Sequence, residues 1–209
     1  MTELHALRDA YRLQKKTLLT ALLANGSSSR GIHALLRKLS RLADGLLCTL
    51  WQRAALPPGL VLAAVGGYGR EQLFPYSDID VLVLLPGDLP QPEAVRTQIE
   101  GFIRSCWDAG LEIGSSVRTV EECLAEAAAD VTVQTSLLEA RHVQGDAALF
   151  ARFERQFGAH LDPHAFLTAK TLEMRQRHTK YENTPYALEP NCKESPGGLR
   201  DLQMILWVA

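Results

Sequence analysis

The chain has 209 residues, with 22 lysines and arginines against 24 aspartates and glutamates, and 46% of its side chains are hydrophobic. This length supports one good-sized domain or two small ones, with an adequate core. The formal net charge of −2 argues against the broad basic surface of a dedicated nucleic-acid-binding protein. The sequence contains no run of about 18 apolar residues, so it predicts no membrane-spanning helix. Because the N-terminus does not resemble a signal peptide and the four cysteines are widely spaced, we expect a globular cytoplasmic protein.

The first half of the chain predicts two helices followed by three strands. Apolar residues recur at helical spacing over the first fifty residues, interrupted by a polar stretch at 25–29. Short apolar runs at 60–65 and 79–85 are typical of buried strands, and the second is apolar on both faces beyond Asp80. That pattern predicts helices on both sides of the strand. A helix over about 92–107 and a third strand over 111–118 follow, with Thr119 capping the next helix.

The second half is predicted to be mostly helical, with helices over 131–143, 147–157, 163–181 and 199–209 and an interruption at 183–198. The expected fold class is therefore α+β, with a small mixed sheet flanked by helices and helical segments at both ends. We expect an N-terminal helical segment over 1–56, a core over 57–145 and a C-terminal helical segment over 146–209. The last helix lacks a terminating glycine or asparagine, which favours a piece of a longer protein.

Gly66 and Gly67 end one predicted strand, and Asp78 and Asp80 open the next. Residues i and i+2 of a strand point to the same side, about 6.6 Å apart, so both carboxylates can hold the same cations. Mg²⁺ prefers such oxygen ligands and leaves positions open for phosphate oxygens, and glycine backbone can closely approach a triphosphate. A lone Asp-x-Asp is more often a solvated turn or a helix cap. At the mouth of a very apolar strand, however, two unneutralised charges would repel each other, and a cation supplies their partner.

This arrangement resembles the nucleotidyltransferase superfamily typified by DNA polymerase beta, whose members share a Gly-Gly or Gly-Ser pair, a spacer and Asp-x-Asp. Further motifs resemble the N-terminal nucleotidyltransferase domain of the bifunctional PII uridylyltransferase/uridylyl-removing enzymes. These motifs lie at 65–70, 73–80, 114–119, 134–141, 186–191 and, the most family-specific, 193–203. The chain departs from the family pattern at Glu71, where we expect a small residue such as glycine.

The resemblance implies transfer of UMP from UTP to a tyrosine of the PII signalling proteins, with Mg²⁺ or Mn²⁺, in nitrogen regulation under glutamine control. It implies polymerase-beta-type folding of the core. Full-length members of the family continue into an HD-type phosphohydrolase domain and two ACT domains. We expect these to be absent here, since no His-Asp dipeptide occurs in the sequence.

A third carboxylate is common in this superfamily, as the base that helps to deprotonate the attacking hydroxyl. Glu112, at the start of the third predicted strand, is the best candidate for that role. A surface glutamate at a strand entrance explains the residue equally well. Asp108, at the end of the preceding helix, is a weaker rival.

Two other polar residues near these motifs can each have a functional or a structural role. Arg70 contacts triphosphate oxygens or forms a structural salt bridge near Glu71. Ser77 contacts the nucleotide or bonds its own backbone, and the second reading is slightly favoured.

Four basic residues outside the glycine motif have similar alternatives. Lys193 and Arg200, which flank the Ser-Pro-Gly-Gly stretch, are within the family-specific motif and are candidates to reach a phosphate. Arg118 and Arg141 either line the cleft or serve as structural ion-pair partners.

Two functions compete with uridylyl transfer to PII. One is adenylyl transfer to glutamine synthetase, or a related regulatory nucleotidyl transfer. The other is a fragment that binds PII or a nucleotide without turnover, although the presence of both glycines and both aspartates disfavours it.

Overall fold

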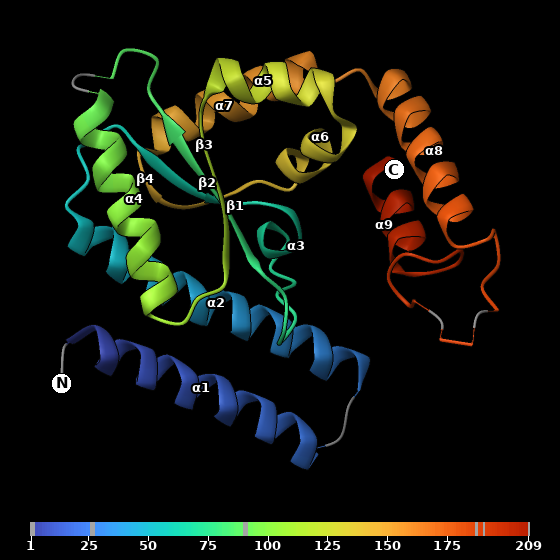
Figure 1. Cartoon of the computed structure of the whole chain (residues 1–209), viewed down its shortest axis with the longest axis horizontal. Coiled ribbons are helices and arrows are strands. Elements are labelled where there is room, and N and C mark those ends of the chain that lie inside the picture. The colour runs from blue at the N-terminus through green and yellow to red at the C-terminus, as the bar shows by residue number, and fades with distance from the viewer. Residues whose placement is uncertain (1–2, 26–27, 90–91, 187, 190, 209) are drawn as a thin grey trace.

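The computed structural model describes residues 3–25, 28–89, 92–186, 188–189 and 191–208, which form nine helices and a four-stranded sheet (Figure 1). In chain order the elements are α1 (Glu3–Asn25), α2 (Ser29–Ala54), β1 (Val61–Ala64), α3 (Gly66–Gly69), β2 (Ile79–Leu85), α4 (Pro92–Asp108), β3 (Ile113–Thr119), α5 (Val120–Ala129), α6 (Val131–Leu138), β4 (Arg141–Gly145), α7 (Ala147–His160), α8 (Pro163–Lys180) and α9 (Leu199–Val208).

The sheet has the strand order β3-β2-β1-β4. β1 pairs antiparallel with both β2 and β4, whereas β2 and β3 are parallel and are joined by the crossover helix α4. A mixed sheet flanked by helices is the α+β architecture predicted from the sequence, and that prediction is confirmed.

Helices cover both faces of the sheet, as the apolar pattern of β2 predicts. On one face, Ile79, Val81 and Val83 of β2 belong to a core that includes buried residues of α2 and α4. On the other face, Leu82 and Leu84 pack with buried residues of α5, α6 and α7. Figure 1 shows α2, with α1 beyond it, on one side of the sheet and α5 and α7 on the other. β2 is therefore shielded from water on both faces along most of its length.

The expected helix over 131–143 is wrong in its second half. α6 ends at Leu138, and Arg141–Gly145 form the edge strand β4, which pairs only with β1. Most β4 side chains are half-buried, and a register shift interrupts the pairing between Leu62 and Ala63 of β1. Such a strand lacks the apolar alternation by which strands are recognised in a sequence.

The helix that follows β3 begins as predicted. The Thr119 hydroxyl accepts a hydrogen bond from the Glu122 backbone N–H, and the Glu122 carboxylate accepts one from the Thr119 N–H, 2.7 Å away. This reciprocal capping box satisfies two backbone donors that a helix start otherwise leaves free.

α8 and α9 lie side by side at one end of the molecule, next to α3 and α6 (Figure 1). Lys170 of α8 is buried, pairs with Glu173 at 3.0 Å, and has its ammonium 4.7 Å from the ring centre of Trp207 on α9. The Trp207 indole N–H also donates to the Glu139 carboxylate at the end of α6. These contacts attach the C-terminal helices to the sheet-bearing part of the chain.

No helix in the described ranges is both long and apolar enough to cross a membrane.

Gly69 is a position where the fold depends directly on the absence of a side chain. A Cβ there would lie 2.0 Å from the Glu139 carbonyl oxygen and 3.1 Å from that of Ala64. Because the clash is with backbone, Gly69→Ala must displace α3 or the end of α6, and we expect it to lower the free energy of unfolding by about 2 kcal/mol or more. Urea denaturation followed by circular dichroism measures the change.

Gly101→Ala is the matched control, because a Cβ at Gly101 in the middle of α4 would meet nothing within 4 Å. It should be neutral or stabilise the chain by up to about 1 kcal/mol, as expected for alanine in a helix interior. Equal stability of the two variants would contradict the close contact at Gly69.

Candidate nucleotidyl-transfer site

The glycine motif forms a single helical turn at the end of β1. Gly66 has a φ of +58°, a backbone conformation that residues with a Cβ rarely adopt. A Cβ on Gly66 would lie 3.6 Å from Oδ2 of Asp80, so the turn lies directly beside that carboxylate. The two glycines that end the strand thus lie in a compact turn, α3, which places their backbone next to the Asp80 carboxylate.

Asp80 shares a face of the sheet with the neighbouring acidic residue. It has the same parity along β2 as Leu82 and Leu84, and Asp78, two residues earlier, falls on that face as well. Both carboxylates are exposed on one side and line a pocket of about 460 Å³, called here the carboxylate pocket. The convergence that the Asp-x-Asp spacing predicts is thus present in the structure.

Gly114 makes room for the Asp80 carboxylate. It is the direct partner of Asp80 in the parallel β2–β3 ladder, and a Cβ on Gly114 would lie 2.6 Å from Oδ1 of Asp80. Sequence reasoning passed over this residue, although a glycine inside a strand often marks a close approach of another group.

The electrostatics of the carboxylate pocket favour a bound cation. Burial raises the pKa of Asp80, and the nearby charge of Asp78 raises that pKa further. The positive charges of Lys193 and Arg200 act in the opposite direction. The ionised pair is therefore under-neutralised by the protein alone.

A divalent cation fits this donor set. Asp78 and Asp80 supply hard carboxylate oxygens and leave one side open for further oxygen ligands, which is how Mg²⁺ and Mn²⁺ are held beside phosphates. Among the described residues there is no group of three or more His, Cys, Asp and Glu side chains that would hold a metal ion by itself.

Glu112 is adjacent to the pair without completing a three-carboxylate cluster. It precedes β3 by one residue, and its carbonyl accepts a hydrogen bond from the Ile79 N–H, 2.8 Å away. Continuing the β2–β3 register places Glu112 opposite Asp78. Its side chain lines a separate hollow of about 120 Å³, which shares Ser77 and three neighbouring residues with the carboxylate pocket. Asp108, the rival candidate, is the last residue of α4 and lines neither space.

Arg70 and Ser77 both line the carboxylate pocket. The Arg70 guanidinium donates to Gln72 Oε1 at 3.1 Å and forms a structural ion pair, but its partner is Glu139 and not a residue near Glu71. The backbone N–H of Ser77 donates to the Phe74 carbonyl at 3.1 Å, and its side chain is exposed.

Glu71 has a φ of +58°. This left-handed conformation favours glycine, which accounts for the expectation of a small residue at that position. Its carboxylate lies 3.7 Å from the Arg41 guanidinium on α2.

A half-buried polar cluster formed by Asp44, Tyr68 and Arg141, called here the Asp44 clamp, fixes the glycine turn from the side of α2. Arg141 of β4 donates two hydrogen bonds of 3.0 Å to the Asp44 carboxylate and one of 3.2 Å to the Gly69 carbonyl. Tyr68 donates its hydroxyl to the same carboxylate, and burial followed by the Asp44 charge raises the Tyr68 pKa strongly. Arg141 is therefore a structural ion-pair partner. Sequence analysis missed Asp44, because an aspartate on an amphipathic helix carries no local signal of a distant partner.

The family-specific C-terminal motif contributes the basic wall of the carboxylate pocket. Lys193 and Arg200 line it together with the two aspartates. The Asn191 side chain holds the turn by accepting from the N–H groups of Lys193 and Glu194, at 3.0 and 2.9 Å. A Cβ on Gly198 would lie 2.8 to 3.1 Å from three carbonyl oxygens of the same turn, so glycine allows it to close.

An ion-pair network anchors this turn to α8. Arg177 donates to Oδ1 of Asp201 at 2.8 Å and to the Glu194 carbonyl at 2.8 Å, and His178 lies 2.9 Å from Oδ2 of Asp201. The Asp201 pKa is lowered because hydrogen bonds from Arg177, Gly197 and His178 outweigh the effect of burial. The position of Lys193 and Arg200 is thus fixed by α8.

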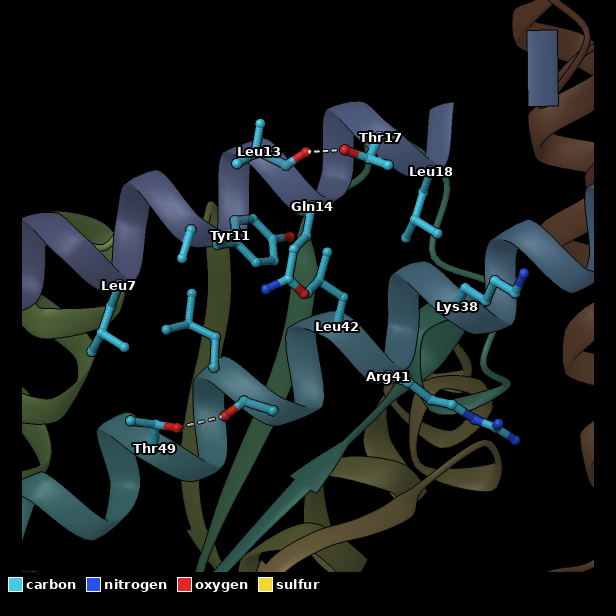
Figure 2. Close-up of a pocket in the computed structure, with 13 residues that line it drawn as sticks. Leu7, Tyr11, Leu13, Gln14, Thr17, Leu18, Lys38, Arg41, Leu42 and Thr49 are labelled. Carbon is cyan, nitrogen blue, oxygen red and sulfur yellow. Dashed lines mark hydrogen bonds between the residues drawn. The ribbon is translucent and has the colours of Figure 1, made fainter. Parts of the chain in front are cut away.

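Figure 2 shows a different hollow, of about 750 Å³, between α1 and α2. Its lining is mainly apolar, with Leu7, Tyr11, Leu18 and Leu42 facing the space and Lys38 at one end. It shares no lining residue with the carboxylate pocket, and no carboxylate faces it. The hollow between α1 and α2 is therefore separate from the carboxylate pocket.

Comparison with known proteins matches these features to two family models. One, described as a nucleotidyltransferase domain, matches residues 47–136 and so includes the glycine turn, both aspartates and Glu112. The other, described as GlnD PII-uridylyltransferase, matches residues 165–209, which include Lys193 and Arg200. A crystal structure of a toxin–antitoxin with AMP-PNP aligns with 67% of this chain and 96% of its own, at 13% identity and a TM-score of 0.33.

Curated relatives from three genera carry one name, bifunctional uridylyltransferase/uridylyl-removing enzyme. The Ralstonia nicotianae protein is 56% identical over 90% of this chain, that of Cupriavidus pinatubonensis 55% over 96%, and that of Burkholderia mallei 57% over 90%. The chain spans 22% of the length of each. By these matches the chain belongs to the PII-uridylyltransferase family of enzymes and carries its nucleotidyltransferase domain.

Proposed function

We propose that this chain transfers UMP from UTP to a tyrosine of a PII signalling protein, in a reaction that depends on Mg²⁺ or Mn²⁺. The observation that carries the proposal is the placement of Asp80 on β2 and of Asp78 one residue before this strand, both lining the carboxylate pocket beside the turn of Gly66 and Gly67. The names of the relatives favour uridylyl transfer over adenylyl transfer. We further propose that the reaction serves nitrogen regulation in the cytoplasm, within a longer protein that also carries HD-type and ACT domains.

In the proposed reaction, the tyrosine oxygen attacks the α-phosphorus of UTP, the bond from that phosphorus to the bridging oxygen breaks, and pyrophosphate leaves. Asp78 and Asp80 hold the divalent cation, which when bound offsets negative charge on the phosphates. The backbone of Gly66 and Gly67 contacts the triphosphate. Glu112 accepts the tyrosine proton, since the hydroxyl has an ordinary pKa of about 10 and needs a base.

Ser77 and Arg70 have supporting roles in this proposal. Both line the carboxylate pocket, and the Arg70 guanidinium keeps its ion pair with Glu139 while its remaining donors face the nucleotide. Lys193 and Arg200 neutralise the pyrophosphate as it leaves.

Asp78→Asn and Asp80→Asn should each lower the rate of UMP transfer roughly a hundredfold or more, because each removes a charged ligand of the cation. Incubating the 209-residue variants with Mg²⁺, UTP and a purified PII protein, followed by mass spectrometry of the PII protein, measures the added UMP. Glu112→Gln should slow transfer strongly while leaving UTP binding unchanged, if it is the base.

The same variants need a stability readout. The pKa of Asp80 is raised in the folded chain, so the folded state holds this proton more tightly and loses stability as the pH rises through that interval. Asp80→Asn removes the buried charge and should not lower the melting temperature of the metal-free chain at pH 7. Near-normal transfer by either aspartate variant would refute the site, and addition of AMP from ATP in place of UMP would refute the proposed substrate.

Gly114→Ala should impair transfer without unfolding the chain. The new Cβ would meet only the end of the Asp80 side chain, which can rotate away and so leave its place as a ligand. We expect weaker Mn²⁺ binding by calorimetry and a melting temperature close to that of the wild type. Ser115→Ala, at the next and exposed position of β3, is the control and should change neither. Unchanged Mn²⁺ affinity in Gly114→Ala would contradict the proposed role of Asp80.

Lys193→Ala and Arg200→Ala should each raise the KM for UTP roughly tenfold, since each removes a charged partner of the triphosphate. The effect should shrink at high salt, which screens these charges. Arg175→Ala, an exposed arginine on α8 that lines neither wall of the pocket, should leave the KM unchanged. A KM equally insensitive to all three substitutions would show that the C-terminal turn does not contact the nucleotide.

A further inference from the structure

Gln203 on α9 carries a polar side chain that the fold leaves without a partner. The residue is 8% exposed, and its amide forms no hydrogen bond within the part of the chain that the structure describes. Its amide atoms are not among the described side-chain atoms that are fully buried without a partner, so they reach the open space that Gln203 lines. The Gln203 amide is therefore accessible to a ligand that enters that space.

Two adjoining spaces meet at Gln203. It lines the carboxylate pocket and also a second hollow of about 350 Å³, called here the α9 hollow. Arg70 is the other residue that lines both. Gln203 and Arg70 thus lie at the boundary between the carboxylate pocket and the α9 hollow.

The α9 hollow differs in chemistry from the carboxylate pocket. Its wall is largely apolar, with Leu138, Ala140, Leu206 and Trp207. Its one carboxylate, that of Glu139, is already engaged.

Both partners of Glu139 come from the same wall. It accepts from the Trp207 indole N–H and pairs with the Arg70 guanidinium. The amide of Gln203 is then the polar side chain of this wall that is left to bind something else.

A nucleotide has the same division of chemistry along its length. Its phosphates need cations and its base is a flat, largely apolar ring with polar groups on one edge. With the phosphates at Asp78 and Asp80, a nucleotide that extends past Arg70 and Gln203, which line both spaces, would place its base in the α9 hollow. A polyanion would gain little in an apolar space, whereas a base buries its ring there.

We propose that the α9 hollow is the nucleobase subsite and that the Gln203 amide hydrogen-bonds the polar edge of the base. This inference rests on the proposed function, since that function places the phosphates. An amide presents one acceptor and two donors side by side, which matches the N–H and carbonyl of a uracil edge. Gln203 is thus a specificity-determining residue supplied by the family-specific C-terminal motif.

Calorimetry on the 209-residue chain separates the base from the phosphates. The titrants are the non-hydrolysable uridine analogue UMPNPP with Mg²⁺, and inorganic tripolyphosphate with Mg²⁺. Gln203→Leu should weaken binding of UMPNPP roughly ten- to hundredfold and leave binding of tripolyphosphate unchanged, because only the base loses its hydrogen bonds. Gln203→Met, which is unbranched and favourable in helices, serves as a second variant if the leucine unfolds the chain.

Gln176→Leu is the matched control, since Gln176 is exposed on the neighbouring helix α8 and should change neither titration. Wild-type affinity for UMPNPP in both Gln203 variants would overturn the base subsite while leaving the proposed function intact. Equal weakening of UMPNPP and tripolyphosphate would overturn it as well, because the effect would then be structural. If the wild-type chain binds neither titrant, the proposed function fails and the subsite fails with it.

Discussion

Two negative charges stand at the entrance of a strand that is buried on both faces. β2 pairs with β1 on one side and β3 on the other, and its apolar residues join two separate cores. Burial and repulsion by the Asp78 charge raise the pKa of Asp80. An ionised pair is therefore unfavourable at this end of an otherwise apolar strand. Carboxylates at such a position cost stability, and the cation of the proposed function would offset that cost when bound. The other residues of the site surround these two carboxylates.

Three segments far apart in the sequence surround the acidic pair. α2 contributes Asp44, through which Tyr68 and Arg141 fix the glycine turn against the sheet. β3 contributes Gly114, whose missing side chain leaves space for Asp80. The C-terminal turn contributes Lys193 and Arg200. In the sequence α2 carries only an apolar stripe that indicates packing. Through Asp44 it also holds the site in place.

Sequence patterns predict the parts of this fold in which burial follows a regular period. The helices, the three strands up to β3 and the covering of β2 on both faces follow from apolar spacing, and the capping box at Thr119 follows from local chemistry. β4 was missed because an edge strand of half-buried, mostly polar residues has no such period. The Asp-x-Asp pair was found because its spacing is local. Asp44 and Gln203 were not found, because their importance depends on what lies across space from them and not on their neighbours in the chain.

The carboxylate pocket is formed by two segments of the chain that match different family models. Residues 47–136 match a nucleotidyltransferase domain, while the basic wall lies in the segment that matches the PII-uridylyltransferase model. The near-neutral overall charge agrees with the proposed function, in which a few placed cationic side chains, and not a broad basic surface, would meet the phosphates.

A crystal of this chain grown with Mn²⁺ and UMPNPP, with anomalous diffraction recorded near the manganese absorption edge, tests the central claim most directly. The manganese peak should lie between the carboxylates of Asp78 and Asp80, with the terminal phosphates directed toward Lys193 and Arg200. A manganese peak elsewhere, or a nucleotide bound away from the two aspartates, would contradict the assignment of β2 as the element that carries the reaction.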